Sequence, residues 1–111
     1  MHERRMVLGA VAVIALALWT HRSDAQQSPD KSAGRRLAES WCGTCHIVTP
    51  ETASAVSNGV PTFVGIARNE ATRADSLRAF LQTPHAGMPD LHLSREEIDD
   101  LIAYILGLRG K

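Results

Sequence analysis

The two cysteines of this chain stand two residues apart and are followed at once by a histidine, in the order Cys42-Gly43-Thr44-Cys45-His46. A C-x-x-C-H sequence is typical of covalent haem attachment. Two thiols with this spacing can each add to one vinyl group of a haem and form thioethers, and the adjacent imidazole can then ligate the iron. We therefore predict one covalently bound haem c, with thioethers at Cys42 and Cys45 and with His46 as an axial iron ligand.

Three other interpretations of the cysteine pair fit the chain less well. A zinc site needs four ligands, and the chain has no second cysteine pair to complete one. A redox dithiol of the thioredoxin kind belongs to a βαβ unit, and the sequence shows no convincing strand alternation. A disulfide between Cys42 and Cys45 is compatible with an exported protein, but it would close a very short loop and add little stability.

The N-terminal segment has the pattern of a secretory signal peptide. Arg4 and Arg5 precede an unbroken apolar run at 7–19, and small residues end the segment at Ala25. This order of charged, apolar and small residues predicts a signal peptide of residues 1–25, cleaved after Ala25. The alternative is an uncleaved anchor, but the run is shorter than the roughly 20 apolar residues that span a bilayer. We expect an exported bacterial protein that resides in the periplasm.

Cleavage at that point would leave 86 of the 111 residues. We predict a flexible leader at 26–31 and one domain at 32–111. A protein core of this size is marginal without an additional stabilising element. A buried haem would supply the missing apolar core.

The predicted domain reads as all-helical. Its clearest helix follows Ser94, which forms a capping box with Glu97. The apolar stripe of this helix recurs at helical spacing, at Ile98, Leu101, Ile102, Ile105 and Leu108.

The other helical segments are shorter or less regular. A helix is predicted over 72–83, with Thr72 and Asp75 as its capping box. Its apolar face is expected to consist of Leu77, Phe80 and Leu81. The remaining predictions are a short helix at 32–41, one apolar turn at 61–67 and loops at 47–59 and 84–93.

The second axial position of the iron has four candidate occupants, which are Met88, His85, His92 and water. Met88 lies between the two best helices and is the only methionine beyond the predicted signal peptide. A thioether is a soft ligand that stabilises ferrous iron and so raises the reduction potential. We predict Met88 as the second axial ligand.

Taken in this order and spacing, residues 32–108 resemble the class I cytochromes c, in particular the small soluble mono-haem proteins of bacteria. The resemblance implies a small helical fold around one covalent haem, in which the first and last helices cross near Gly34. It places Tyr104 as the aromatic that packs on that crossing. It implies that the Pro61 carbonyl accepts a hydrogen bond from the proximal imidazole, and that Met88 is the axial methionine.

The chain also departs from that family. Leu37 and Ala38 stand where many relatives have an aromatic residue, so we expect the helix contact to rest on Leu37 and Trp41. The lysine-rich face of mitochondrial carriers is missing, because Lys31 and Lys111 are the only lysines after the predicted signal peptide.

The resemblance implies a periplasmic electron carrier that cycles one iron between Fe(III) and Fe(II). Its partners would be a redox protein donor and acceptor, such as a dehydrogenase and an oxidase or reductase, with membrane contact only if the signal segment is retained. Twelve Lys and Arg balance twelve Asp and Glu, which gives no polycationic surface for nucleic acid. No catalytic residue is predicted. The alternatives are a dedicated cytochrome subunit of a periplasmic dehydrogenase and, less favoured, an open-site haem protein with ligand-binding or peroxidatic activity.

Overall fold

The computed structural model describes residues 27–52, 59–83 and 87–111. The predicted signal peptide and its cleavage site lie outside these residues. The elements in chain order are α2 (Lys31–Leu37), the π-helical turn η1 (Ala38–Cys42), the 3-10 turn η2 (Pro50–Thr52), α3 (Phe63–Arg68), α4 (Ala74–Gln82) and α5 (Arg95–Gly107). No β-strand occurs in the described ranges, so the all-α prediction is confirmed there.

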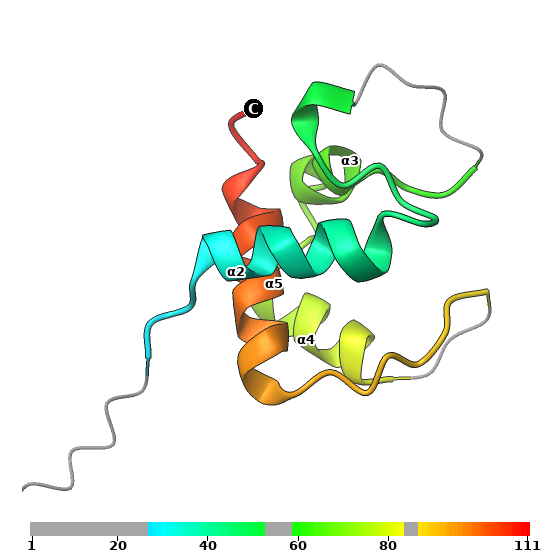
Figure 1. Cartoon of the computed structure of the whole chain (residues 1–111). Coiled ribbons are helices and arrows are strands. Elements are labelled where there is room, and N and C mark those ends of the chain that lie inside the picture. The colour runs from blue at the N-terminus through cyan, green and yellow to red at the C-terminus, as the bar shows by residue number, and fades with distance from the viewer. Residues whose placement is uncertain (1–26, 53–58, 84–86) are drawn as a thin grey trace, which may run out of the picture.

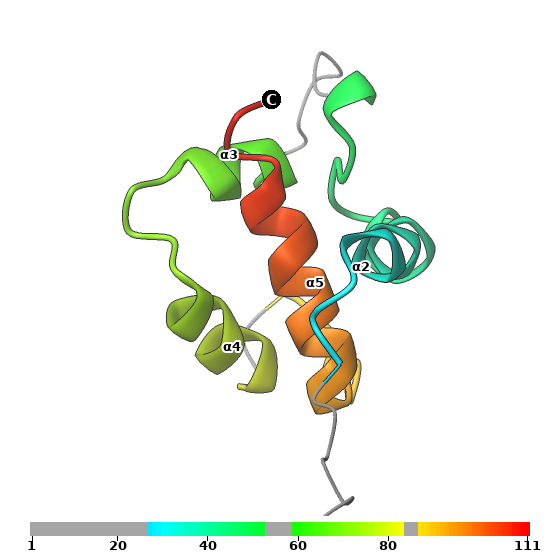
Figure 2. The ribbon, with the colours of Figure 1, turned by 90° about the vertical axis from the view of Figure 1, so that its left-hand side faces the viewer.

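Helix α5 runs through the middle of the domain and contacts α2, α3 and α4 (Figures 1 and 2). Helix α2 crosses it on one side, while α3 and α4 lie on the other. Within the described residues, no helix has the length and apolar content needed to cross a membrane.

Helix α5 begins where its local signals predict. The Ser94 hydroxyl accepts from the Glu97 N–H at 3.2 Å, and the Ser94 N–H donates to the Glu97 carboxylate at 2.8 Å. The predicted capping box is therefore confirmed. Every residue of the predicted apolar stripe is buried and joins the main hydrophobic cluster. The other members of that cluster are Ala38, Cys42, Val48, Phe63, Val64, Ala67, Leu77 and Tyr104.

Helix α2 starts at Lys31, inside the segment that we expected to be a flexible leader. The Asp30 carboxylate accepts from the N–H and the hydroxyl of Ser32, at 2.8 and 2.7 Å. The Asp30 N–H in turn donates to the Asp100 carboxylate of α5 at 2.7 Å. These contacts fix the start of α2 against the last helix.

The crossing of α2 and α5 is at Gly34, as the resemblance implies, but its closest partner is not Tyr104. A Cβ atom at Gly34 would lie 2.1 Å from the Asp100 carbonyl oxygen and 3.0 Å from the Leu101 nitrogen. The two helix backbones therefore touch where glycine leaves room. Leu37 packs against the core as expected, whereas Trp41 is half-exposed and does not.

The N-terminal cap of α4 differs from the predicted one. The helix begins at Ala74, and the Arg73 N–H donates to the Ser76 hydroxyl at 2.9 Å. The predicted pair of Thr72 and Asp75 does not form the cap. Leu77 is buried and Leu81 packs against the core, but Phe80 is 50% exposed, so the predicted apolar face of α4 is only partly covered.

Candidate haem site

The C-x-x-C-H motif begins at the end of a widened helical turn. Helix α2 continues into η1, where the Gly43 N–H donates to the Ala38 carbonyl at 2.9 Å across five residues. The chain then turns sharply, since the N–H groups of Cys45 and His46 both donate to the Cys42 carbonyl, at 3.1 and 2.9 Å. Single π-helical turns are frequent at functional sites. Nothing in the sequence pattern predicted this one.

Both cysteines are free thiols in environments of different kinds. Cys42 is buried and Cys45 is exposed, and no disulfide joins them. Burial raises the pKa of the Cys42 thiol above its usual range. Among the described residues no three His, Cys, Asp or Glu side chains gather as they would around a metal ion. Two thioether bonds to a haem require two separate thiols, and this turn provides them.

The His46 ring is oriented by a backbone carbonyl. Its Nδ1 lies 2.7 Å from the Pro61 oxygen. Because a carbonyl can only accept, Nδ1 carries the proton and Nε2 keeps its lone pair. An imidazole held in this tautomer by a carbonyl is the usual form of an iron or zinc ligand. The site residues present therefore fit a haem, and the hydrogen bond implied by the resemblance is present.

Two further contacts hold the segment that follows His46. The Ile47 carbonyl accepts from the Phe63 N–H at 2.9 Å, which joins this segment to the start of α3. The buried Tyr104 hydroxyl donates to the Val48 carbonyl at 2.7 Å, which joins it to α5. The Phe63 ring lies near both other rings, with its centroid 5.5 Å from that of His46 and 6.5 Å from that of Tyr104. Ile47 is thus held by α3, and Val48 is held by α5.

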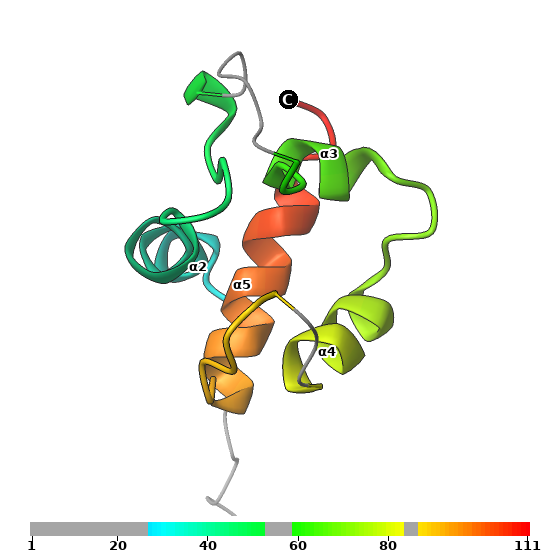
Figure 3. The same ribbon diagram turned by 90° about the vertical axis from the view of Figure 1, so that its right-hand side faces the viewer.

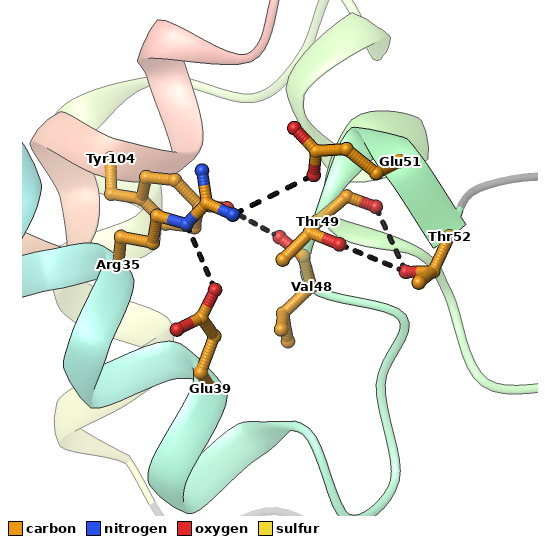
Figure 4. A network of polar contacts seen from close by, with 7 residues as sticks. All are labelled: Arg35, Glu39, Val48, Thr49, Glu51, Thr52 and Tyr104. Carbon is orange, nitrogen blue, oxygen red and sulfur yellow. Dashed lines mark hydrogen bonds and ion pairs between the residues drawn. The ribbon is translucent and has the colours of Figure 1, made fainter.

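Charged side chains surround this segment on the side of α2 (Figure 4). Arg35 contacts Glu39 at 2.8 Å and Glu51 at 3.7 Å. Its hydrogen bond to Glu39 is the main reason that the pKa of Arg35 is raised. Sequence reasoning did not identify these three residues. Their spacing gives a signal only for Arg35 and Glu39, which are four residues apart on one helical face.

Met88 is half-buried in the loop between α4 and α5. It lines a shallow hollow together with Leu81, Thr83, Pro89, Asp90, Leu91 and Leu93, and His46 is not among the lining residues. The His92 side chain is 86% exposed, and the His92 N–H donates to the Asp90 carboxylate at 3.0 Å. His85 lies outside the described residues. Of the two described candidates for the second axial position, Met88 is therefore the more enclosed.

The segments that carry the predicted ligands lie on the same side of the domain. In Figure 3 the loop that begins at Gly87 passes in front of α5, and the helical segment of α2 and η1 lies to the left of α5 and is seen end-on. Both segments also lie on the right of the domain in Figure 1.

Comparison with known proteins gave two matches. The family model described as "Cytochrome C oxidase, cbb3-type, subunit III" matches residues 29–105, a range that includes every predicted site residue. Cytochrome c-552 of Bradyrhizobium diazoefficiens is 39% identical over 101 residues, which cover 91% of this chain and 93% of that protein. No solved structure was found to match the chain.

Proposed function

The chain belongs to the family of small c-type cytochromes, and we propose that it carries electrons between redox proteins of the bacterial periplasm with Cys42, Cys45, His46 and Met88 holding its haem. Membership of this family makes the chain a mono-haem electron carrier with covalently bound haem c. The observation that best supports the ligand assignment is the contact between His46 Nδ1 and the Pro61 carbonyl.

That contact determines how His46 can act. The carbonyl holds the ring in one orientation and makes Nε2 a stronger donor toward a metal. The bonds from Phe63 to Ile47 and from Tyr104 to Val48 keep the following backbone in place. His46 would therefore stay in the same position whichever charge the iron carries. When bound, the haem supplies a one-electron couple between Fe(III) and Fe(II).

Met88 would act on the opposite face of the ring. Its thioether favours ferrous iron and would raise the reduction potential relative to a second imidazole. Pro89 follows it directly and restricts the backbone of the loop. The Ser94–Glu97 capping box anchors the far end of the same loop to α5.

The carrier function is tested by voltammetry of the haem-loaded protein and by exposure of its reduced form to carbon monoxide. We expect a reversible one-electron couple and poor binding of carbon monoxide, since two protein ligands would occupy both axial positions. A high-spin ferric protein that binds carbon monoxide readily when reduced would favour the open-site alternative.

The periplasmic location is proposed from the signal-peptide pattern and from the motif itself. Covalent attachment to C-x-x-C-H takes place outside the cytoplasmic membrane, so export precedes assembly. Cell fractionation should recover the haem protein in the periplasm, and mass spectrometry should find its N-terminus at or near Gln26. An intact Met1 on membrane-bound protein would instead show that the segment is retained as an anchor.

A free carrier and a dedicated dehydrogenase subunit would use the same haem ligands. The two differ in what accompanies the protein in the cell. Purification from the native periplasm without detergent should yield the free carrier alone. Recovery in a fixed ratio with one dehydrogenase would make the chain a subunit of that enzyme.

A further inference from the structure

Charged residues are nearly absent from the segments that carry the proposed haem ligands. Glu51 is the only Asp, Glu, Lys or Arg between residues 40 and 67, and residues 79–89 contain none. All other charged residues after position 29 lie in three ranges, which are 30–39, 68–78 and 90–111. Charge is therefore segregated away from the candidate haem site.

Three carboxylates in or beside these segments already have polar partners inside the protein. Glu39 and Glu51 both contact Arg35, at 2.8 and 3.7 Å, as Figure 4 shows. Asp90 accepts from the His92 N–H at 3.0 Å and lies 3.5 Å from the His92 ring. These groups are poorly placed to form ion pairs with a second protein, because a new partner would compete with an existing one.

We call the exposed residues beside the proposed haem ligands, within 41–45 and 87–89, the uncharged face. Its members among the described residues are Trp41, Gly43, Thr44, Cys45, Gly87 and Pro89. The end of η1 and the loop after Gly87 lie on the same side of the domain in Figure 3.

Trp41 is the largest side chain of the uncharged face. It is 49% exposed, and it directly precedes Cys42, one of the two residues that would hold the haem by a thioether. Tryptophan is enriched at the centres of protein interfaces and is among the residues whose truncation costs most binding energy. An exposed tryptophan at this position can contact another protein directly.

We propose that the uncharged face, anchored by Trp41, docks a redox protein whose own docking surface is uncharged and apolar. This inference rests on the proposed function, because electrons would cross at the haem edge that this face surrounds. A charged partner surface would lose hydration here and find no opposite charge in return. Association through this face would also receive little electrostatic steering and would depend weakly on salt.

The test uses voltammetry of the haem-loaded protein on gold electrodes that carry chemically defined monolayers. One monolayer ends in mixed methyl and hydroxyl groups, the second in carboxylates and the third in amines. We expect the electron-transfer rate constant to be at least about tenfold higher on the uncharged layer than on either charged layer. On the uncharged layer it should change less than about twofold between low and high salt.

Variants connect the result to Trp41. Trp41→Glu should slow transfer on the uncharged layer at least about tenfold, whereas Trp41→Phe, which keeps an aromatic contact, should stay close to wild type. Gly110→Glu is the matched control, because it adds the same charge where a Cβ atom meets nothing within 4 Å. The absorption spectrum of Trp41→Glu should equal that of wild type, and the midpoint potential of the uncharged variant Trp41→Phe should also equal that of wild type.

Several outcomes would overturn the inference. Faster transfer on a carboxylate or amine layer would show that docking is electrostatic. If Gly110→Glu slowed transfer on the uncharged layer as much as Trp41→Glu, docking would not depend on Trp41 in particular. A changed spectrum in Trp41→Glu, or a changed potential in Trp41→Phe, would show that Trp41 packs on the haem instead of facing a partner. Absence of any one-electron couple would overturn the proposed function, and this inference with it, whereas the other outcomes leave the proposed function intact.

Discussion

Gly34 of α2 lies against the backbone carbonyl of Asp100 in α5, so closely that a Cβ atom at Gly34 would be 2.1 Å from the carbonyl oxygen. The obstacle is backbone and not the end of a flexible side chain. It cannot move unless one helix shifts along or away from the other. The crossing of the first and last helices therefore depends on the absence of a side chain at one residue.

Gly34→Ala should lower the free energy of unfolding of the haem-loaded protein by about 1–3 kcal/mol, because the added methyl group forces the helices apart. Gly34→Val should cost at least as much. Gly107→Ala is the control, since the atoms nearest to a Cβ atom there belong to the flexible Lys31 side chain, the first of them at 3.5 Å. Denaturant unfolding measures all three, and an unchanged midpoint for Gly34→Ala would refute the close contact.

Tyr104→Phe should remove one hydrogen bond and leave the aromatic packing in place. The Val48 carbonyl would lose its donor in a buried position, so we expect a loss of about 1–3 kcal/mol in the free energy of unfolding. Burial raises the pKa of Tyr104 above its usual range. The neutral phenol is thus favoured in the folded state, and its contribution is present below about pH 10 and is lost as the pH rises through the folded pKa. Wild type should therefore lose more stability in alkali than Tyr104→Phe, and equal losses would contradict the contact.

Ser94→Ala should destabilise the start of α5 by about 1 kcal/mol at neutral pH, the usual cost of losing an N-terminal cap. The backbone hydrogen bond from Ser94 is the main cause that lowers the pKa of Glu97. The stabilisation from the ionised Glu97 carboxylate is present above the ordinary pKa of glutamate. It is lost as the pH falls through the lowered pKa of Glu97 in the folded protein. Acid should therefore destabilise wild type more than Glu97→Gln. Glu96→Gln removes the same charge from the same turn and serves as the control, which should keep the acid sensitivity of wild type.

Cys42→Ala and Cys45→Ala should each weaken haem attachment, and the double variant should abolish it. Each single variant would keep one thioether, whereas the double variant would hold the haem only through axial bonds. Denaturing gel electrophoresis with a stain for haem peroxidase activity distinguishes these cases. Release of haem from the denatured wild-type polypeptide would show that the attachment is not covalent.

Helix α5 could be predicted from the sequence because its signals are local. Ser94 and Glu97 are three residues apart, and the apolar stripe repeats along one helix. The cap of α4 could not be predicted in this way, since tertiary contacts compete for the predicted residue. The Thr72 carbonyl accepts from Arg109 of the C-terminal turn at 2.7 Å, and the Thr72 N–H donates to Asn69 at 3.0 Å. The N-cap of α4 is consequently Arg73 and not Thr72, and the helix starts at Ala74.

The candidate site was predictable in its chemistry but not in its surroundings. The C-x-x-C-H motif identifies donor atoms, and the resemblance to a family supplied Pro61. The π-helical turn before Cys42 leaves no mark in the sequence, because a single extra residue per turn requires no special residue type. Helical periodicity placed Phe80 on the apolar face of α4. Periodicity predicts the direction in which a side chain points from the helix, but it does not predict how far other residues cover that side chain. The half-exposed Trp41 was expected to pack for a different reason, because Leu37 and Ala38 stand where many members of the family have an aromatic residue.

The most direct test of the central claim is the far-red absorption band of the ferric protein. Ligation by the Met88 sulfur opposite His46 should give low-spin iron with a weak sulfur-to-iron band in this region. Met88→Ala should remove the band, open the iron to carbon monoxide in the reduced state and lower the reduction potential, while His85→Ala and His92→Ala should retain it. A wild-type protein without the band, or a change of spin state in either histidine variant, would contradict the assignment of Met88 as the second axial ligand.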